Sequence, residues 1–118
     1  MAQSASDTMV PATAIDRRHL ARMTFGDRSL EQEVLQLFDR QSALLLARMR
    51  TGDGAAIGAL AHTLKGSATG IGAGPVARAA EATEQAAAHA PGELSATIDR
   101  LAAAVDEARV LIAELLRQ

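Results

Sequence analysis

One histidine and one lysine stand out in the segment "ALAHTLKGSATGIGAG", residues 59–74. They are His62 and Lys65, and the segment has no Cys, Asp or Glu to assist them. On a helix, at about 100° per residue, its apolar side chains gather within an arc of roughly 100° that would face a core. His62 points away from that arc, on a face of small residues with Lys65 at its edge. The apolar set is Ile57, Leu60, Ala61, Leu64, Ala68 and Ile71, and the small residues are Gly58, Gly66 and Thr69.

An exposed imidazole with little bulk around it and a cation one turn away is suited to accepting and releasing a phosphoryl group. Imidazole in general titrates near pH ~6.5, so it is mostly an uncharged nucleophile at neutral pH. Glycine costs a helix interior about 1 kcal/mol relative to alanine, so Gly58 and Gly66 are hard to explain by stability. They would instead let another protein approach His62 closely. The plainer alternatives are that His62 is an ordinary surface histidine and that the glycines are close-packing positions between helices.

The sequence "AHTLKGSA", residues 61–68, resembles the signature of histidine-containing phosphotransfer (HPt) domains: His, any residue, Leu, Lys, Gly, Ser or Ala, Ala. The resemblance extends more loosely over about residues 15–117 and includes "FGDRSLEQEVLQLF", residues 25–38. It implies a four-helix bundle whose histidine is phosphorylated by the aspartyl phosphate of a receiver domain. By this resemblance the phosphoacceptor is His62, the family's lysine is Lys65, and its small contact position is Gly66.

The resemblance also implies partners and further site residues. Receiver domains of response regulators or hybrid histidine kinases would be the partners in a two-component phosphorelay. Family members often have a polar residue on the next helix that contacts the imidazole, and an acidic residue there would depart from the family pattern. The expected docking face consists of Gly58, Gly66, Ser67 and Thr69, and the candidates for the polar residue are Glu81, Glu84 and Gln85.

The expected protein is a phosphoryl carrier, not an enzyme with its own kinase activity, because no nucleotide-binding G-x-x-x-x-G-K-[ST] sequence is present. We expect no cofactor or metal ion on the carrier itself, since the receiver supplies the Mg²⁺ and most of the electrostatic stabilisation. The alternative function is a non-catalytic helical module that binds a receiver or kinase domain. A phosphate that moves onto the protein and is labile in acid but stable in base would separate the two.

The composition argues against several other classes of protein. The 118 residues have a net charge of −2 and 2% aromatic residues, whereas nucleic-acid binders typically have basic surfaces and aromatic platforms. Without cysteine there is no disulfide or thiolate metal site. No apolar run reaches the ~18 to 20 residues of a membrane span, and the N-terminus lacks the pattern of a secretory signal. We therefore expect a cytoplasmic protein that binds neither nucleic acid nor membrane.

The sequence says less about the oligomeric state and about the two remaining histidines. A monomer is expected. The alternative is a dimer whose interface is formed by the apolar residues near the C-terminus. His19 and His89 stand alone in the sequence, with no carboxylate or cysteine at the spacing of a metal site. Both are expected to be solvated side chains.

Cap and turn signals divide the chain into helices. A flexible tail is expected over residues 1–14 and the bundle domain over 15–118. A short helix should end near Gly26, after which Asp27 caps a long helix that stops at "TGDG", residues 51–54. The remaining helices are expected over about 53–70, from Gly74-Pro75 to "HAPG" at 89–92, and over about 93–117.

The predicted fold class is all-α: an antiparallel four-helix bundle with a short additional N-terminal helix. No segment shows the alternation of a β-strand, and β-branched residues are sparse. In the first long helix, the apolar residues near helical spacing are Leu30, Val34, Leu37, Phe38, Leu45 and Met49. In the last helix they are Leu94, Ile98, Leu101, Val105, Ala108, Ile112 and Leu115.

Overall fold

The computed structural model describes residues 12–118, and its regular elements are all helical. No strand occurs in this part of the chain. The prediction of an antiparallel four-helix bundle with a short additional N-terminal helix is confirmed. The elements are η1 (Ala12–Ala14), α2 (Arg17–Met23), α3 (Arg28–Met49), α4 (Gly54–Ile71), α5 (Gly74–His89), η2 (Pro91–Glu93) and α6 (Leu94–Leu116).

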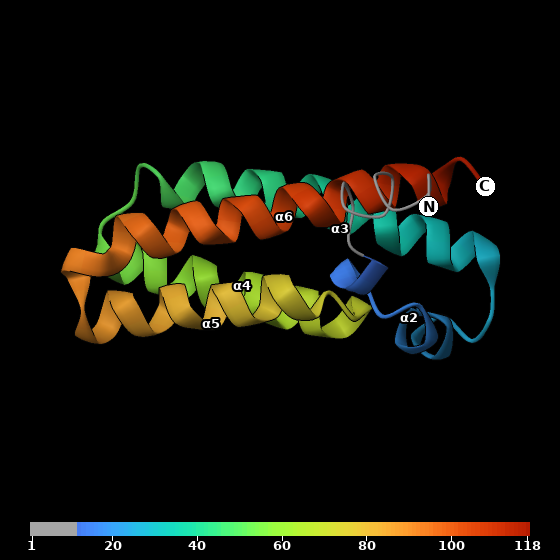
Figure 1. The fold of residues 1–118 in the computed structure, drawn as a ribbon, viewed down its shortest axis with the longest axis horizontal. Helices are drawn as coiled ribbons and strands as arrows, with labels where there is room; N and C mark the ends of the chain where they lie inside the picture. The colour runs from blue at the N-terminus through green and yellow to red at the C-terminus, as the bar shows by residue number, and fades with distance from the viewer. Residues whose placement is uncertain (1–11) are drawn as a thin grey trace, which may run out of the picture.

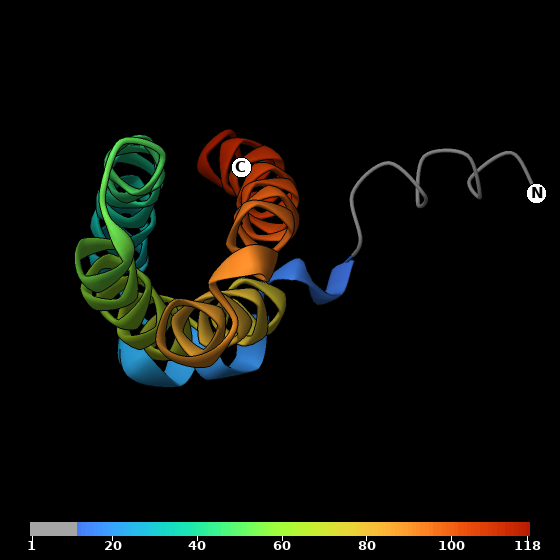
Figure 2. The same ribbon diagram turned by 90° about the vertical axis from the view of Figure 1, so that its left-hand side faces the viewer.

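The four long helices run along the length of the molecule, each antiparallel to the next (Figure 1). In sequence order each packs against its neighbour, and α6 returns to pack against α3. Seen end-on, α4 and α5 form the layer opposite α3 and α6, and α2 lies on the outer side of the α4–α5 layer (Figure 2). The outer surface of α4 and α5 is therefore bordered by α2 at one end.

Local signals explain where the helices begin. The carboxylates of Asp16, Asp27 and Asp53 accept hydrogen bonds from backbone N–H groups in the first turns of α2, α3 and α4, at 2.9–3.1 Å. Such caps satisfy donors that the helix itself leaves unpaired. Pro75 stands in the first turn of α5, where its missing N–H costs nothing. The cap predicted at Asp27 and the helix start predicted at Gly74-Pro75 are confirmed.

The turn between α4 and α5 depends on Gly72. This residue has φ +84°, a left-handed conformation that glycine adopts without the penalty of a Cβ. A Cβ on it would also lie 2.9 Å from the carbonyl oxygen of Asp16. Gly72 in turn accepts a hydrogen bond from the backbone N–H of Asp16 at 2.8 Å. The turn thereby holds the start of α2 against the end of α4.

The histidine of α2 corrects one expectation. His19 is not a freely solvated side chain: it is half-buried, and its Nε2 lies 3.1 Å from the carbonyl oxygen of Gly70. Because a carbonyl only accepts, Nε2 carries the proton in this contact. Leu20 of α2 is also buried, so this short helix is fixed to the bundle by both a polar and an apolar contact. His89, at the end of α5, is exposed as expected.

The core-facing side of α3 differs from the sequence pattern at one pair of leucines. Leu37 was expected to be apolar core, but it is 56% exposed, whereas Leu35 is 1% exposed. Leu35 lies three residues before Phe38, in phase with it, while Leu37 adjoins Phe38 and turns away. Ser42 takes the next core position, where its hydroxyl donates to the carbonyl oxygen of Asp39 at 3.2 Å. The buried set of α3 is Leu35, Phe38, Ser42, Leu45 and Met49.

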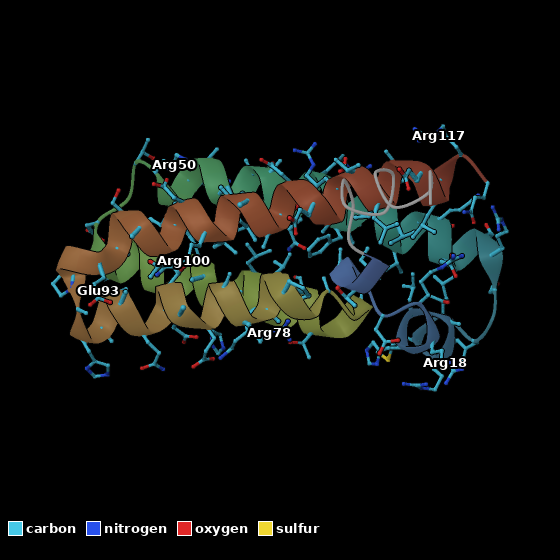
Figure 3. The ribbon with its side chains drawn as sticks, viewed as in Figure 1. Arg18, Arg50, Arg78, Glu93, Arg100 and Arg117 are labelled. Carbon is cyan, nitrogen blue, oxygen red and sulfur yellow. The ribbon has the colours of Figure 1, made fainter. Side chains whose placement is uncertain are left out.

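The other helices bury the residues that the pattern indicates. In α6 they include Ile98, Leu101, Val105, Ala108, Ile112 and Leu115, while Leu94 is half-buried. Charged side chains lie on the outside, among them the exposed Arg18, Arg50, Arg78, Glu93, Arg100 and Arg117 labelled in Figure 3. Among the described residues, no helix is both long enough and apolar enough to cross a membrane.

The N-terminal tail expected over residues 1–14 lies mostly outside the described residues. Its last three residues form η1, and Ala14 is 2% exposed. Ile15, the first residue of the expected domain, is 1% exposed and belongs to the core. Packing against the bundle therefore includes at least the end of the segment that the sequence assigned to the tail.

Candidate functional site

The outward face of α4 carries the residues that the sequence singled out for chemistry. Ile57, Ala61 and Leu64 are buried beneath it, which leaves His62 on the opposite side with 67% of its side chain exposed. Lys65 stands one turn further along and is more enclosed, with 30% of its side chain exposed. The helix thus presents the imidazole to solvent and turns the lysine toward α5.

The imidazole is held by a carboxylate of the neighbouring helix. His62 Nδ1 lies 2.9 Å from Glu84 Oε2. An ionised carboxylate can only accept a hydrogen bond, so Nδ1 is the nitrogen that carries the proton. The lone pair then belongs to Nε2, at the outer end of the ring. Of the three candidates on the next helix, Glu84 is the one that contacts the ring.

Lys65 does not stand apart as a single positive charge. Its Nζ lies 2.7 Å from Glu81 Oε1 and 3.1 Å from Glu84 Oε1. The second contact is an ion pair without hydrogen-bond geometry. The buried Oε1 of Glu84 is therefore left without a hydrogen-bond partner. Gln85 completes the cluster by donating to Glu81 Oε2 at 3.1 Å. The sequence therefore placed Lys65 near the ring but missed that two carboxylates already neutralise it.

These contacts shift the ionisation of all three charged groups. Glu81, and after it Glu84, raises the pKa of Lys65 above its ordinary value. The hydrogen bond from Lys65 lowers the pKa of Glu81. Lys65 likewise lowers the pKa of Glu84 more than burial raises it. All three groups are consequently charged at neutral pH.

The antiparallel packing of α4 and α5 explains why these residues meet. Moving back three residues along α4, from Lys65 to His62, corresponds to moving forward three along α5, from Glu81 to Glu84. Residues three apart lie on one face of a helix, so each helix presents a matching pair. The spacing of three residues within each pair was visible in the sequence. Only the register of the two helices shows that His62 meets Glu84 and that Lys65 meets Glu81.

The glycines beside His62 leave an open surface. A Cβ added to Gly66 would meet no atom within 4 Å, so close helix packing does not explain this glycine. Gly58 is different, because a Cβ there would lie in ordinary contact, 3.5 Å from Ala87 Cβ of α5. Next to the ring, an open groove of about 580 Å³ runs between α4 and α5. Its lining is mostly small: Gly54, Ala55, Gly58, Ala59, His62, Thr63, Glu84, Ala87 and Ala88.

The two hydroxyl residues of the expected docking face have different neighbours, and neither lines the groove. Ser67 is half-buried and donates to Gln41 Oε1 of α3 at 3.1 Å. Thr69 is exposed, and its hydroxyl donates to the backbone carbonyl of Lys65 at 2.8 Å. Thr69 also lines a small cavity between α2 and the α4–α5 turn. Ser67 thus borders α3, and Thr69 borders α2.

The family assignment rests on a match that spans most of the bundle. Residues 28–117 match the sequence model of the Hpt domain. The chain belongs to the Hpt domain family. It is accordingly a histidine phosphotransfer protein of a phosphorelay, and Hpt domains carry phosphoryl groups between receiver domains without being kinases.

A solved structure shares the fold of this Hpt domain. It is the crystal structure of histidine-containing phosphotransfer protein B (HptB) from Pseudomonas aeruginosa PAO1, with a TM-score of 0.81 and 24% sequence identity. The match covers 91% of this chain and 98% of the other. Among curated proteins, none matches the sequence significantly. Within residues 12–118, no three His, Asp or Glu side chains group closely enough to hold a metal ion.

Proposed function

We propose that His62 is the phosphoacceptor of this Hpt domain and that Nε2 is the atom that bonds to phosphorus. The observation that carries this proposal is the hydrogen bond from His62 Nδ1 to Glu84 Oε2 at 2.9 Å. This hydrogen bond keeps the proton on Nδ1 and leaves the lone pair on Nε2. The ring itself is largely exposed. His19, in contrast, is half-buried and bonded to a backbone carbonyl.

The transfer needs no proton movement at the ring. The lone pair of Nε2 forms the N–P bond while the P–O bond to the receiver's aspartate breaks, and the electron pair stays on that aspartate. The proton stays on Nδ1, hydrogen-bonded to Glu84, throughout, so the ring carries one positive charge while the phosphoryl group is bound. Return transfer is the reverse: a receiver aspartate attacks phosphorus, and the N–P electron pair goes back to Nε2. Glu84 is in this scheme a positioning residue, since it contacts the ring and not the phosphoryl group.

The groove and the open glycine support the docking of a receiver domain on the α4–α5 surface. Gly66 leaves room one turn after His62, and the lining of the groove is mostly Ala and Gly. We propose that the receiver supplies Mg²⁺ and its own charged groups to the transferring phosphoryl group, and that this chain contributes no cofactor and no kinase activity. The partners would be receiver domains of response regulators or hybrid histidine kinases, reached by a monomer in the cytoplasm.

The decisive experiment is phosphoryl transfer from purified receiver domains loaded with radiolabelled acetyl phosphate. The wild-type protein should take up label that is labile in acid and stable in base. His62→Gln should take up none while keeping its helical circular dichroism, because the side chain lies outside the core. His89→Gln is the matched control, since His89 is also exposed on a helix, and it should label like wild type. Binding of a receiver without any labelling would instead favour the non-catalytic interaction module.

A further inference from the structure

The charges around His62 do not favour a bound phosphoryl group. The charged groups that share hydrogen bonds or ion pairs with the ring and its partners are Lys65 of α4 and Glu81 and Glu84 of α5. One cation and two carboxylates leave one net negative charge. A phosphoryl group carries about two negative charges near neutral pH. Because the ring keeps its Nδ1 proton, it gains one positive charge when Nε2 bonds to phosphorus, so phosphorylation adds about one net negative charge. Phosphorylation of Nε2 therefore brings like charges together on this surface.

Lys65 is the neighbouring cation that would offset the phosphoryl charge, and it is already engaged. Its ammonium makes a 2.7 Å hydrogen bond to Glu81 and a 3.1 Å ion pair to Glu84. Glu81 is itself oriented by Gln85. To reach a phosphoryl group on Nε2, Lys65 must leave or share these partners. The attraction that would retain the phosphoryl group is reduced by that competition.

We propose that Glu81 and Glu84 shorten the time for which a phosphoryl group stays on His62, and that Glu81 does so by competing for Lys65. This inference rests on the proposed role of His62 as phosphoacceptor. It describes a carrier that passes its group on rapidly, to a receiver or to water, and that does not store it. In either case the N–P bond breaks, the electron pair returns to Nε2, and phosphorus bonds to the incoming oxygen.

The two carboxylates act differently, and variants can separate them. Glu84 accepts the hydrogen bond from Nδ1–H, so Glu84→Gln changes the ring as well as the charge. Glu81 does not contact the ring and acts only through Lys65 and its own charge. Glu81→Gln is therefore the cleaner probe: it removes one negative charge and one partner of Lys65 while preserving the hydrogen bond between His62 and Glu84.

The test uses the full chain labelled with potassium phosphoramidate, a small phosphoryl donor that requires no receiver. Phosphorus NMR identifies the phosphohistidine and follows its loss at neutral pH, at low and high salt. Glu81→Gln should lengthen the half-life about two- to fivefold, the scale of an exposed ion pair, and the difference should shrink at high salt. Glu81→Asp restores the charge and should return the half-life toward wild type. Glu107→Gln, which removes an exposed carboxylate of α6, should change nothing.

Equal phosphohistidine half-lives for wild type and Glu81→Gln would overturn the inference. It would also be overturned if Glu107→Gln lengthened the half-life as much as Glu81→Gln. A lengthening that Glu81→Asp does not reverse would assign the effect to side-chain shape and not to charge, which also contradicts the proposal. These outcomes are separate from the proposed function. That proposal fails if receivers do not label His62, whereas this one is decided by the lifetime of a phosphohistidine already formed.

Discussion

His62 donates its Nδ1–H to the carboxylate of Glu84, 2.9 Å away across the interface of α4 and α5. The contact joins two helices whose sequences give no direct sign of their register. It decides which nitrogen of the ring is available to a partner.

We predict that the neutral ring of His62 is protonated on Nδ1 and that Glu84→Ala abolishes this preference. The carboxylate accepts from Nδ1, and an alanine leaves the ring without that acceptor. Nitrogen-15 NMR of the imidazole, through its couplings to the ring hydrogens, distinguishes the two tautomers. Glu81→Ala serves as control, because Glu81 does not contact the ring. A wild-type ring protonated on Nε2 would contradict the assignment of the nucleophilic atom.

We predict that Lys65→Ala slows phosphoryl transfer from a receiver by about five- to tenfold without abolishing it. The variant removes the cation that pairs with Glu81 and Glu84 and leaves these carboxylates unbalanced. The rate ratio of wild type to Lys65→Ala should fall as salt rises, because charges open to solvent are screened. Lys65→Arg should keep much of the activity. A ratio that is independent of ionic strength would point to a packing role for Lys65.

Gly66→Gln should make the protein more stable but slow its phosphoryl transfer. Glycine is a poor helix residue, so the substitution is expected to raise the free energy of unfolding by about 0.5 kcal/mol. No atom lies within 4 Å of the position of the new Cβ, so nothing in the fold opposes it. The long side chain would nevertheless occupy the surface where a receiver approaches His62. Gly92→Gln adds the same side chain at an open glycine of η2 and should transfer normally; equal slowing of both variants would argue against a docking role.

The carboxylates of Glu81 and Glu84 predict how the free energy of unfolding changes with pH. The pKa of Glu81 and that of Glu84 are both lowered, so the stability they contribute is fully present above their ordinary value of 4.5 and is lost as pH falls through the lowered values. The difference in urea midpoint between wild type and Glu81→Gln should stay constant from about pH 7 to 5.5 and shrink as the pH falls below the ordinary value of 4.5 and through the lowered pKa of Glu81. A difference that persists at the lowest pH would show that Glu81 stabilises the fold by something other than its charge.

Two neighbouring leucines of α3 test the packing. Leu35→Ala should lower the free energy of unfolding by about 2–5 kcal/mol, because it removes a buried side chain and leaves a cavity. Leu37→Ala should change it by about 0.5 kcal/mol or less, since Leu37 is 56% exposed. Urea denaturation of the two variants measures both values. Similar losses at the two positions would mean that α3 is rotated relative to this structure.

The sequence by itself determined the helices and the outward face of α4. Asp27 and Pro75 act on backbone groups within one turn, so their effects can be predicted without knowing the fold. The angular position of His62 follows from the apolar residues of its own helix. These are local relationships, set by the geometry of the helix.

Only the tertiary structure decided which side chains meet between helices. Glu84 and not Glu81 or Gln85 contacts His62, Lys65 is already paired, and Leu35 takes the core position expected for Leu37. Each outcome depends on how far one helix is shifted or rotated against another. A shift of one turn moves a helix by about 5.4 Å, more than the length of a hydrogen bond. The register is set by packing along the whole interface, so no single motif in the sequence specifies it.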